Sequence, residues 1–80
     1  MKYQCYCCGY YSLEENPEDP TYEICPICRW ENDPIQNSDI DYYGGANRIS
    51  LRDARENYKK MGAKREDCVG RARKPLDSEK

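Results

Sequence analysis

The 80-residue chain lacks histidine and phenylalanine altogether and holds a single tryptophan. Without histidine it has neither the commonest general acid or base, nor a Cys–His nucleophile pair, nor the histidine ligands of the usual hydrolytic zinc site. The sequence therefore favours a non-catalytic protein. It also contains no apolar run long enough for a signal peptide or a membrane span, so we expect a cytoplasmic protein without membrane association.

Large apolar side chains are scarce as well. Only 38% of the residues are hydrophobic, whereas 35% are charged. A domain of this size buries only about 60% of its unfolded surface, and it usually needs a covalent or metal cross-link to be stable. Eight tyrosines and the tryptophan supply much of the apolar area that is present. We therefore expect a conventional core to be insufficient.

Cysteine, by contrast, is abundant, and four of the six cysteines form two Cys-x-x-Cys pairs separated by sixteen residues. This spacing lets both sulfurs of a pair point at one ion. The alternative is the disulfide framework of a small secreted domain, but no export signal supports it. In a reducing compartment the thiols stay free to bind metal. The sequence predicts one metal site with four ligands: Cys5, Cys8, Cys25 and Cys28.

A set of four cysteine sulfurs suits zinc or a single iron. The segments around the two pairs resemble the two metal-binding turns, or knuckles, of rubredoxins, which are iron electron carriers. The interval between the pairs is much shorter here than in a rubredoxin, and Arg29 stands where that family usually has glycine. We therefore predict structural Zn²⁺, with Fe in a rubredoxin-like electron carrier as the alternative.

Two cysteines remain outside the predicted site. Cys7 lies between two ligands, and the geometry that turns Cys5 and Cys8 inward should turn its side chain away from the ion. Cys68 is expected as a half-buried thiol. Cys7 is interpreted as an inert filler, although a thiol near a metal can be reactive.

Three short strands are predicted near the knuckles, at 10–13, at 22–24 and at Trp30. They are rich in β-favouring side chains and are separated by a loop containing Pro17 and Pro20, which argue against a helix. The following stretch, 32–47, has many turn-forming residues and is predicted as a long loop. Tyr42 and Tyr43 are expected to anchor it.

One amphipathic helix is predicted from Leu51 to Met61. Ser50 is a suitable N-cap with Asp53 at the third helical position, and Gly62 can end the helix in a left-handed conformation. An apolar stripe should pack against the knuckles, and an ion pair is expected on the exposed side. The stripe comprises Leu51, Ala54, Tyr58 and Met61, and the pair comprises Glu56 and Lys60.

These elements predict a single small α+β domain, stapled by metal, with zinc-ribbon or rubredoxin-like knuckles, a short antiparallel sheet and one or two C-terminal helices. Its expected parts are a two-knuckle zinc ribbon at 1–34, a loop at 35–49, the packed helix at 50–62, and a short helical turn with a tail at 63–80. The helical turn is expected around 65–69.

Charge is distributed unevenly along the chain. Residues 1–47 carry two basic and nine acidic side chains, whereas residues 48–80 carry eleven basic and six acidic ones. A nucleic-acid-binding ribbon usually has basic residues around its knuckles, and this one has acidic residues there. The asymmetry favours contact between the two halves or the orientation of a partner.

The leading functional hypothesis is a binding module for another protein, because tyrosine is favoured at interfaces. The expected contact residues lie in the loop with Gly44 and Gly45 and on the helix: Tyr42, Tyr43, Arg52, Arg55 and Lys59.

Nucleic-acid binding is the alternative to a protein partner, with tyrosine rings available for stacking on bases. It would use basic residues of the second half: Arg48, Arg52, Arg55, Lys59, Arg71, Arg73 and Lys74. The acidic first half makes us expect weak binding.

Most of the chain also resembles the small bacterial cysteine-rich CPCC domain family. The similarity covers the first knuckle and several later segments, namely Cys5, Cys7, Cys8, Gly9 and Tyr10, 22–30, 44–47, 50–58 and 73–75. The chain departs from the pattern at Tyr6, where the proline of the family motif would stand, but both ligands of that knuckle are kept. The resemblance implies a zinc-ribbon-like domain.

Overall fold

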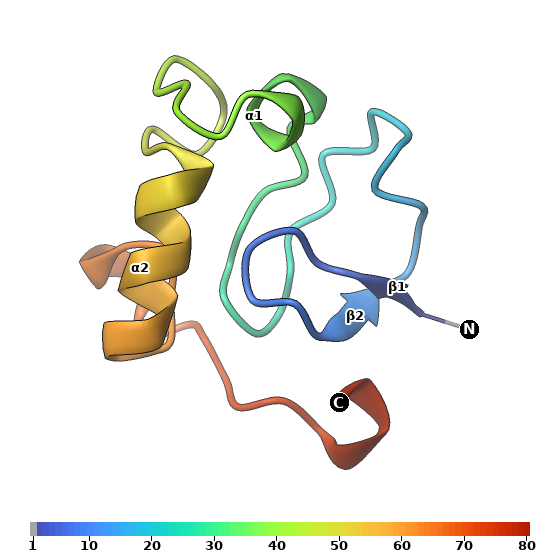
Figure 1. The fold of residues 1–80 in the computed structure, drawn as a ribbon. Coiled ribbons are helices and arrows are strands. Elements are labelled where there is room, and N and C mark those ends of the chain that lie inside the picture. Colours follow the sequence, from blue (N-terminus) through green and yellow to red (C-terminus); the bar gives the residue numbers. More distant parts are fainter. Residues whose placement is uncertain (1) are drawn as a thin grey trace.

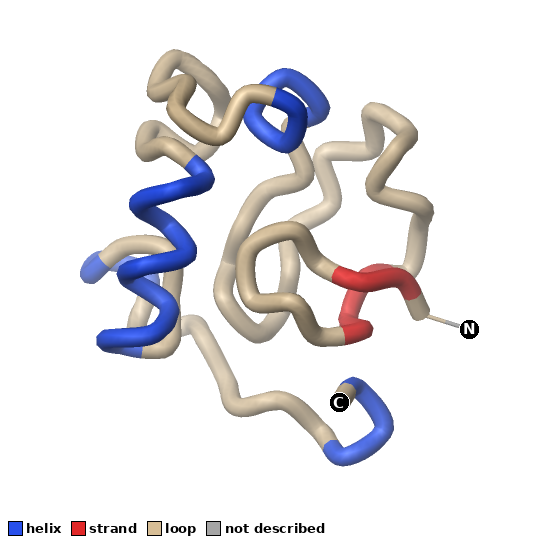
Figure 2. The backbone as a smooth tube through the Cα atoms, in the orientation of Figure 1, coloured by secondary structure: helices blue, strands red, loops and turns tan. Residues whose placement is uncertain are grey.

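The computed structural model describes residues 2–80 and shows a thin molecule with principal extents of 32 × 27 × 16 Å. Figures 1 and 2 show that loops connect a few short elements and one longer helix. These observations confirm the predicted small α+β class. In chain order the elements are β1 (Tyr3–Gln4), β2 (Tyr11–Leu13), α1 (Pro34–Ser38), α2 (Leu51–Met61) and the 3-10 turns η1 (Glu66–Cys68) and η2 (Asp77–Glu79).

The sheet is smaller than predicted. Strands β1 and β2 pair antiparallel on either side of the first knuckle, with Tyr3 opposite Leu13. The predicted strand at 10–13 therefore exists, and β1 is an element that the sequence did not reveal. The predicted strand at 22–24 is wrong: only an isolated bridge joins Ile24 to Glu31. Tyr22 has a φ of 54°, which interrupts the extended conformation that a strand needs.

Helix α2 has the predicted bounds and caps. The Ser50 hydroxyl accepts a hydrogen bond from the Asp53 N–H, and Gly62 ends the helix with a φ of 78°. Leu51 and Ala54 are fully buried, whereas Met61 is 36% exposed, so its prediction as a core residue is wrong. It sits in the last turn of the helix, where it borders a surface hollow together with Tyr58 and Val69.

The helix also differs from the prediction in its ion pair. Glu56 pairs with Lys59 at 3.7 Å, one position earlier than the expected pair with Lys60. Both spacings bring side chains together on a helix surface, and exposed pairs of this kind contribute little to stability.

The predicted loop at 35–49 is wrong at its start, because Pro34–Ser38 forms helix α1. The Asp33 carboxylate caps this helix, accepting hydrogen bonds from the N–H groups of Ile35 at 2.9 Å and Gln36 at 3.4 Å. Pro34 occupies the first turn, where its missing N–H costs nothing. The Asp-Pro pair was interpreted as a turn, although it is equally a helix-start signal.

Buried amide side chains, together with the Tyr43 hydroxyl, anchor the loop that follows α1. The Gln36 amide donates to the carbonyls of Tyr42 at 2.8 Å and Ile49 at 2.7 Å. Tyr42 and Tyr43, the predicted anchors, are 40% and 58% exposed. Gly45 passes so close to Gln36 that a Cβ atom there would lie 2.5 Å from the Gln36 side chain, which explains the need for glycine.

The C-terminal part contains the predicted helical turn, now seen as η1, and then crosses back to the sheet. There η2 packs against β2, so the end of the chain lies beside its beginning (Figure 1). The core that all these elements surround is formed largely by sulfur and by a few apolar side chains: Cys5, Cys7, Leu13, Cys25, Ile27, Cys28, Trp30, Leu51 and Ala54.

Candidate metal centre

The first knuckle is a tight turn closed by two backbone hydrogen bonds. The Cys5 N–H donates to the Tyr10 carbonyl at 2.9 Å, and the Gly9 N–H donates to the Cys5 carbonyl at 3.0 Å. Gly9 has a φ of 81°, a conformation that glycine adopts without a steric penalty. The turn thereby places the side chains of Cys5 and Cys8 on its inner side, as the sequence predicted.

The second knuckle repeats this pattern twenty positions later in the sequence. The Cys25 N–H donates to the Trp30 carbonyl at 2.9 Å, and the Arg29 N–H donates to the Cys25 carbonyl at 2.9 Å. Arg29 has a φ of 72°, so it adopts the conformation of Gly9 despite its side chain. The structure therefore holds two near-equivalent knuckles that face each other.

Between the knuckles, the four predicted ligand atoms come together: the Sγ atoms of Cys5, Cys8, Cys25 and Cys28 all lie within 4.8 Å of one another. The Sγ of Cys5 is 3.7 Å from that of Cys28, and the Sγ of Cys8 is 3.8 Å from that of Cys25. Four sulfurs placed tetrahedrally at the usual zinc–sulfur distance of about 2.3 Å are about 3.8 Å apart. The four cysteines can therefore bind a metal ion.

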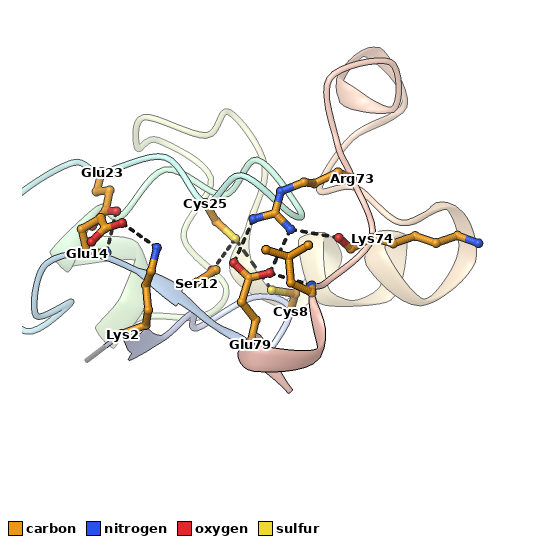
Figure 3. Close-up of polar contacts among 10 residues, drawn as sticks. Lys2, Cys8, Ser12, Glu14, Glu23, Cys25, Arg73, Lys74 and Glu79 are labelled. Atoms are coloured by element: carbon orange, nitrogen blue, oxygen red, sulfur yellow. Dashed lines mark hydrogen bonds and ion pairs between the residues drawn. The ribbon is translucent and has the colours of Figure 1, made fainter.

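Two backbone N–H groups and one hydroxyl group lie within hydrogen-bonding distance of the sulfurs. The backbone N–H groups of Cys7 and Trp30 lie 3.4 Å from the Sγ atoms of Cys5 and Cys28, respectively. The Ser12 hydroxyl lies 3.0 Å from the Cys25 Sγ (Figure 3). Donors of this kind favour a thiolate, which is the form that binds metal. Ser12 is a contributor to the site that sequence reasoning missed.

The thiols interact strongly with one another. Hydrogen bonds with the thiols of Cys28, Cys5 and Cys8 lower the pKa of Cys25. The hydrogen bond between Cys28 and Cys25 in turn raises the pKa of Cys28. Cys25 also raises the pKa of Cys5 and of Cys8. Adjacent negative charges repel one another, so without a cation the ionisation of one thiol opposes the loss of protons from its neighbours. A divalent ion would displace these protons.

The C-terminal tail closes over this region. Arg73 forms two hydrogen bonds of 2.8 Å with the Glu79 carboxylate (Figure 3). Its backbone N–H donates to the Ile27 carbonyl at 3.2 Å. Arg73 lowers the pKa of Glu79 to about 2. The pair fixes the tail beside the second knuckle and puts a guanidinium near the thiolates. Sequence reasoning missed it because the tail showed no helical periodicity.

Cys7 and Cys68 both lie outside the four-sulfur cluster. Cys7 is buried in the core next to the first knuckle, and Cys68 is buried in η1, more deeply than the half-buried position predicted for it. Cys7 packs within the core cluster, whereas the Cys68 Sγ lies 3.8 Å from the Asp67 carboxylate and 3.9 Å from the Arg65 guanidinium.

The residues predicted to contact a partner lie on α2 and the loop before it. Arg52 forms an ion pair with Asp41 at 2.6 Å, and the Tyr43 hydroxyl donates to the Asp53 carboxylate. The Arg55 guanidinium donates to the Tyr6 carbonyl at 2.8 Å. Together with Tyr42 and the exposed Lys59, these residues line one side of the helix and the adjoining loop.

Arg55 also borders a hollow of about 650 Å³ at the first knuckle, whose walls include Tyr3, Tyr6 and Pro17.

Among residues 2–80, no helix combines the length and the apolar character needed to cross a bilayer.

Comparison with curated proteins finds no match to this chain. Its two knuckles and the segments that pack on them do match a described family, Cysteine-rich CPCC, over residues 3–79. The match spans nearly the whole sequence and includes all four clustered cysteines. The protein belongs to the cysteine-rich CPCC family.

Proposed function

We propose that this protein is a non-catalytic module in which a structural zinc ion holds a surface for binding another protein. One observation carries the structural part: four sulfurs from two facing knuckles stand at tetrahedral spacing in the middle of a core that has few apolar side chains. When bound, the ion supplies a cross-link between the two knuckles. Its binding free energy then becomes folding free energy.

Zinc fits the donor set best because four thiolates in a closed tetrahedron are typical of structural zinc sites. Elemental analysis of protein purified without added metal tests this identity. We expect one zinc per chain and a colourless solution. A red solution containing one iron per chain would instead support the electron-carrier alternative.

Two features support a non-catalytic role for the ion. Four cysteines complete a tetrahedral shell, so no position is left for water or a substrate. The sequence has no histidine that could serve as a general base beside it. Catalytic zinc sites, by contrast, keep one position open.

The proposed partner surface joins the predicted contact residues to the hollow at the first knuckle. Arg55 belongs to both, because its guanidinium reaches the Tyr6 carbonyl at the edge of the hollow. Exposed Tyr3 and Tyr43 add aromatic surface on either side. Tyrosine and arginine are the side chains enriched at protein interfaces, and a concave wall gives a partner side chain a place to insert.

Affinity capture from the native host, with the zinc-loaded protein as bait, tests the surface. The double variant Tyr43→Ala with Arg55→Ala should lose a specific partner that the parent protein retains. Lys60→Ala, an exposed change on the same helix outside the surface, is the matched control. Equal recovery of the partner by all three baits would place the interface elsewhere, and no specific protein on any bait would contradict the proposal.

A further inference from the structure

A second, smaller pocket lies beside the second knuckle, with Arg29 in its wall. Its volume is about 250 Å³, and it is formed where the second knuckle meets the loop at 46–48 and the segment at 64–71. None of the four clustered cysteines lines it. Its walls are Ile24, Arg29, Glu31, Ala46, Arg48, Lys64, Arg65, Cys68 and Arg71.

The pocket concentrates positive charge in a protein whose net charge is −2. Five of its walls are cationic and one, Glu31, is a carboxylate. Within the described chain, residues 2–80, no carboxylate oxygen comes within 4.0 Å of a side-chain nitrogen of Arg29, Arg48, Lys64 or Arg71. Like charges gathered with few counter-charges raise the local potential and attract an anion.

Two of the cationic side chains also have hydrogen-bond donors that are out of water and incompletely used. Lys64 is 6% exposed, and the one hydrogen bond from its ammonium group within residues 2–80 goes to the Asn47 amide oxygen at 2.8 Å. The Arg65 Nε is buried without a hydrogen-bond partner, although it lies 3.2 Å from the Asp67 carboxylate. An acceptor in the pocket would add a partner for the Lys64 ammonium group, whereas the enclosed Arg65 Nε, which faces Asp67, contributes only charge.

The backbone holds two more cations at the rim in an unusual conformation. Arg29 and Arg48 have φ values of 72° and 56°, and they are two of the three non-glycine residues with positive φ in the described chain. At Arg29 this conformation is the one that closes the second knuckle, and at Arg48 it lies in the loop that leads to α2. Here it places both arginines beside Lys64.

We propose that this pocket binds a small tetrahedral oxyanion, either free phosphate or the phosphate group of a small phosphate monoester. Guanidinium groups match the oxygens of phosphate in charge and geometry, and an ammonium group adds a point charge. The volume is just below the usual range for small-molecule sites, which suits one phosphate group with a small attached moiety. The acidic first half of the chain opposes the long contact that a polynucleotide would make.

The test is an NMR titration of the zinc-loaded, ¹⁵N-labelled protein at constant ionic strength. Three ligands are compared: inorganic phosphate, a sugar monophosphate and a single-stranded oligonucleotide. We expect saturable shifts of the backbone amides of Arg29, Arg48 and Arg65 at one phosphate per chain. Tighter binding of the monoester would identify a phosphorylated small molecule as the ligand, and equal or weaker binding would identify free phosphate.

Variants at exposed positions keep the test independent of folding. Arg48→Gln and Arg71→Gln should each weaken phosphate binding about tenfold, whereas Lys60→Gln, which removes the same charge from α2, should not change it. Shifts that do not saturate, or that Lys60→Gln reduces equally, would overturn the proposal. So would an affinity for the oligonucleotide that grows with its length while the monoester does not bind, since that result would indicate a nucleic-acid surface.

Discussion

The two knuckles have the same backbone and different surroundings. Both are closed by the same pair of hydrogen bonds, and both have a left-handed residue after the second cysteine. The first knuckle has Gly9 at that position and borders an open hollow. The second has Arg29 and is enclosed, with Trp30 fully covered and the Arg73 backbone bonded to Ile27.

This difference shows that metal binding and folding make different demands on the two knuckles. The ion requires only that each turn present two sulfurs inward, and short backbone bonds are sufficient for that. The second knuckle is additionally tied by its backbone to three later segments, because the N–H groups of Lys64 and Arg73 donate to the Cys28 and Ile27 carbonyls and the Asn47 side chain bonds Glu31. We therefore expect the loss of a cysteine ligand to destabilise the protein equally at either knuckle. The other substitutions described below should destabilise it unequally.

The largest effect should come from removing a ligand, and it should not depend on the knuckle. Cys8→Ser and Cys25→Ser should each abolish stoichiometric metal binding and unfold the chain, because a structural zinc ion supplies on the order of 10 kcal/mol of apparent binding free energy. Metal analysis measures the loss of the bound ion, and the near-ultraviolet circular dichroism of Trp30 measures the unfolding. Cys7→Ser and Cys68→Ser are the matched controls and should keep one ion per chain. If the parent protein kept its native spectra after treatment with a strong chelator, that result would contradict the metal-dependent fold.

The next largest effect should distinguish the knuckles through the aromatic residue after each one. Trp30 is almost completely buried, whereas Tyr10 is half-buried in an edge-to-face contact with Tyr58 at a centroid distance of 6.3 Å. Trp30→Ala should lower the free energy of unfolding by about 3 to 5 kcal/mol. Tyr10→Ala should cost clearly less. Chemical denaturation at a fixed free zinc concentration measures both, and equal losses would show that the knuckles are equally embedded.

A third change should loosen only the second knuckle. The buried Asn47 side chain accepts from the Glu31 N–H at 2.7 Å and donates to the Glu31 carbonyl at 2.8 Å, which ties the loop to the strand-like end of that knuckle. Asn47→Ala leaves these buried groups unpaired and should cost about 1 to 3 kcal/mol. Hydrogen exchange should quicken around 24–31 but not around 4–11. Uniform quickening at both knuckles would indicate that they open together.

The smallest effect should come from placing alanine at the left-handed position of each knuckle. At Gly9 a Cβ atom would have open space, with the nearest atom 3.9 Å away, so Gly9→Ala should cost only the backbone penalty of about 1 to 2 kcal/mol. Arg29→Ala should cost less, because the parent already carries a Cβ at a φ of 72°. Thermal unfolding of the zinc-loaded variants tests the difference. A larger loss at Arg29 would assign this side chain a packing role.

Several features of the fold could be predicted because they depend on neighbours in the sequence. Ser50 and Gly62 delimit α2 through contacts within a few residues, so its bounds could be predicted. The Cys-x-x-Cys turns are local in the same sense. The short helix α1 was also signalled locally by Asp33 and Pro34, but that signal is shared with ordinary turns.

Other features could not be predicted because distant residues decide them. The weak pairing of Ile24 with Glu31 reflects the conformation of Tyr22 and the tie to Asn47, neither of which leaves a periodic pattern. The Ser12 contact with Cys25 and the ion pair between Arg73 and Glu79 join residues whose types are common on any surface. Only their positions in space give them a role at the candidate site.

The amino-acid sequence alone determined that two cysteine pairs form matching turns and that one amphipathic helix covers them, because turn geometry and helical periodicity are properties of short segments. Only the tertiary structure decided that the four sulfurs stand about as far apart as a tetrahedron demands, that later segments are bonded to the second knuckle, and that cationic side chains gather in a pocket beside it. The reason is physical: these properties depend on distances between segments far apart in the chain, and those distances are fixed by packing and by buried hydrogen bonds.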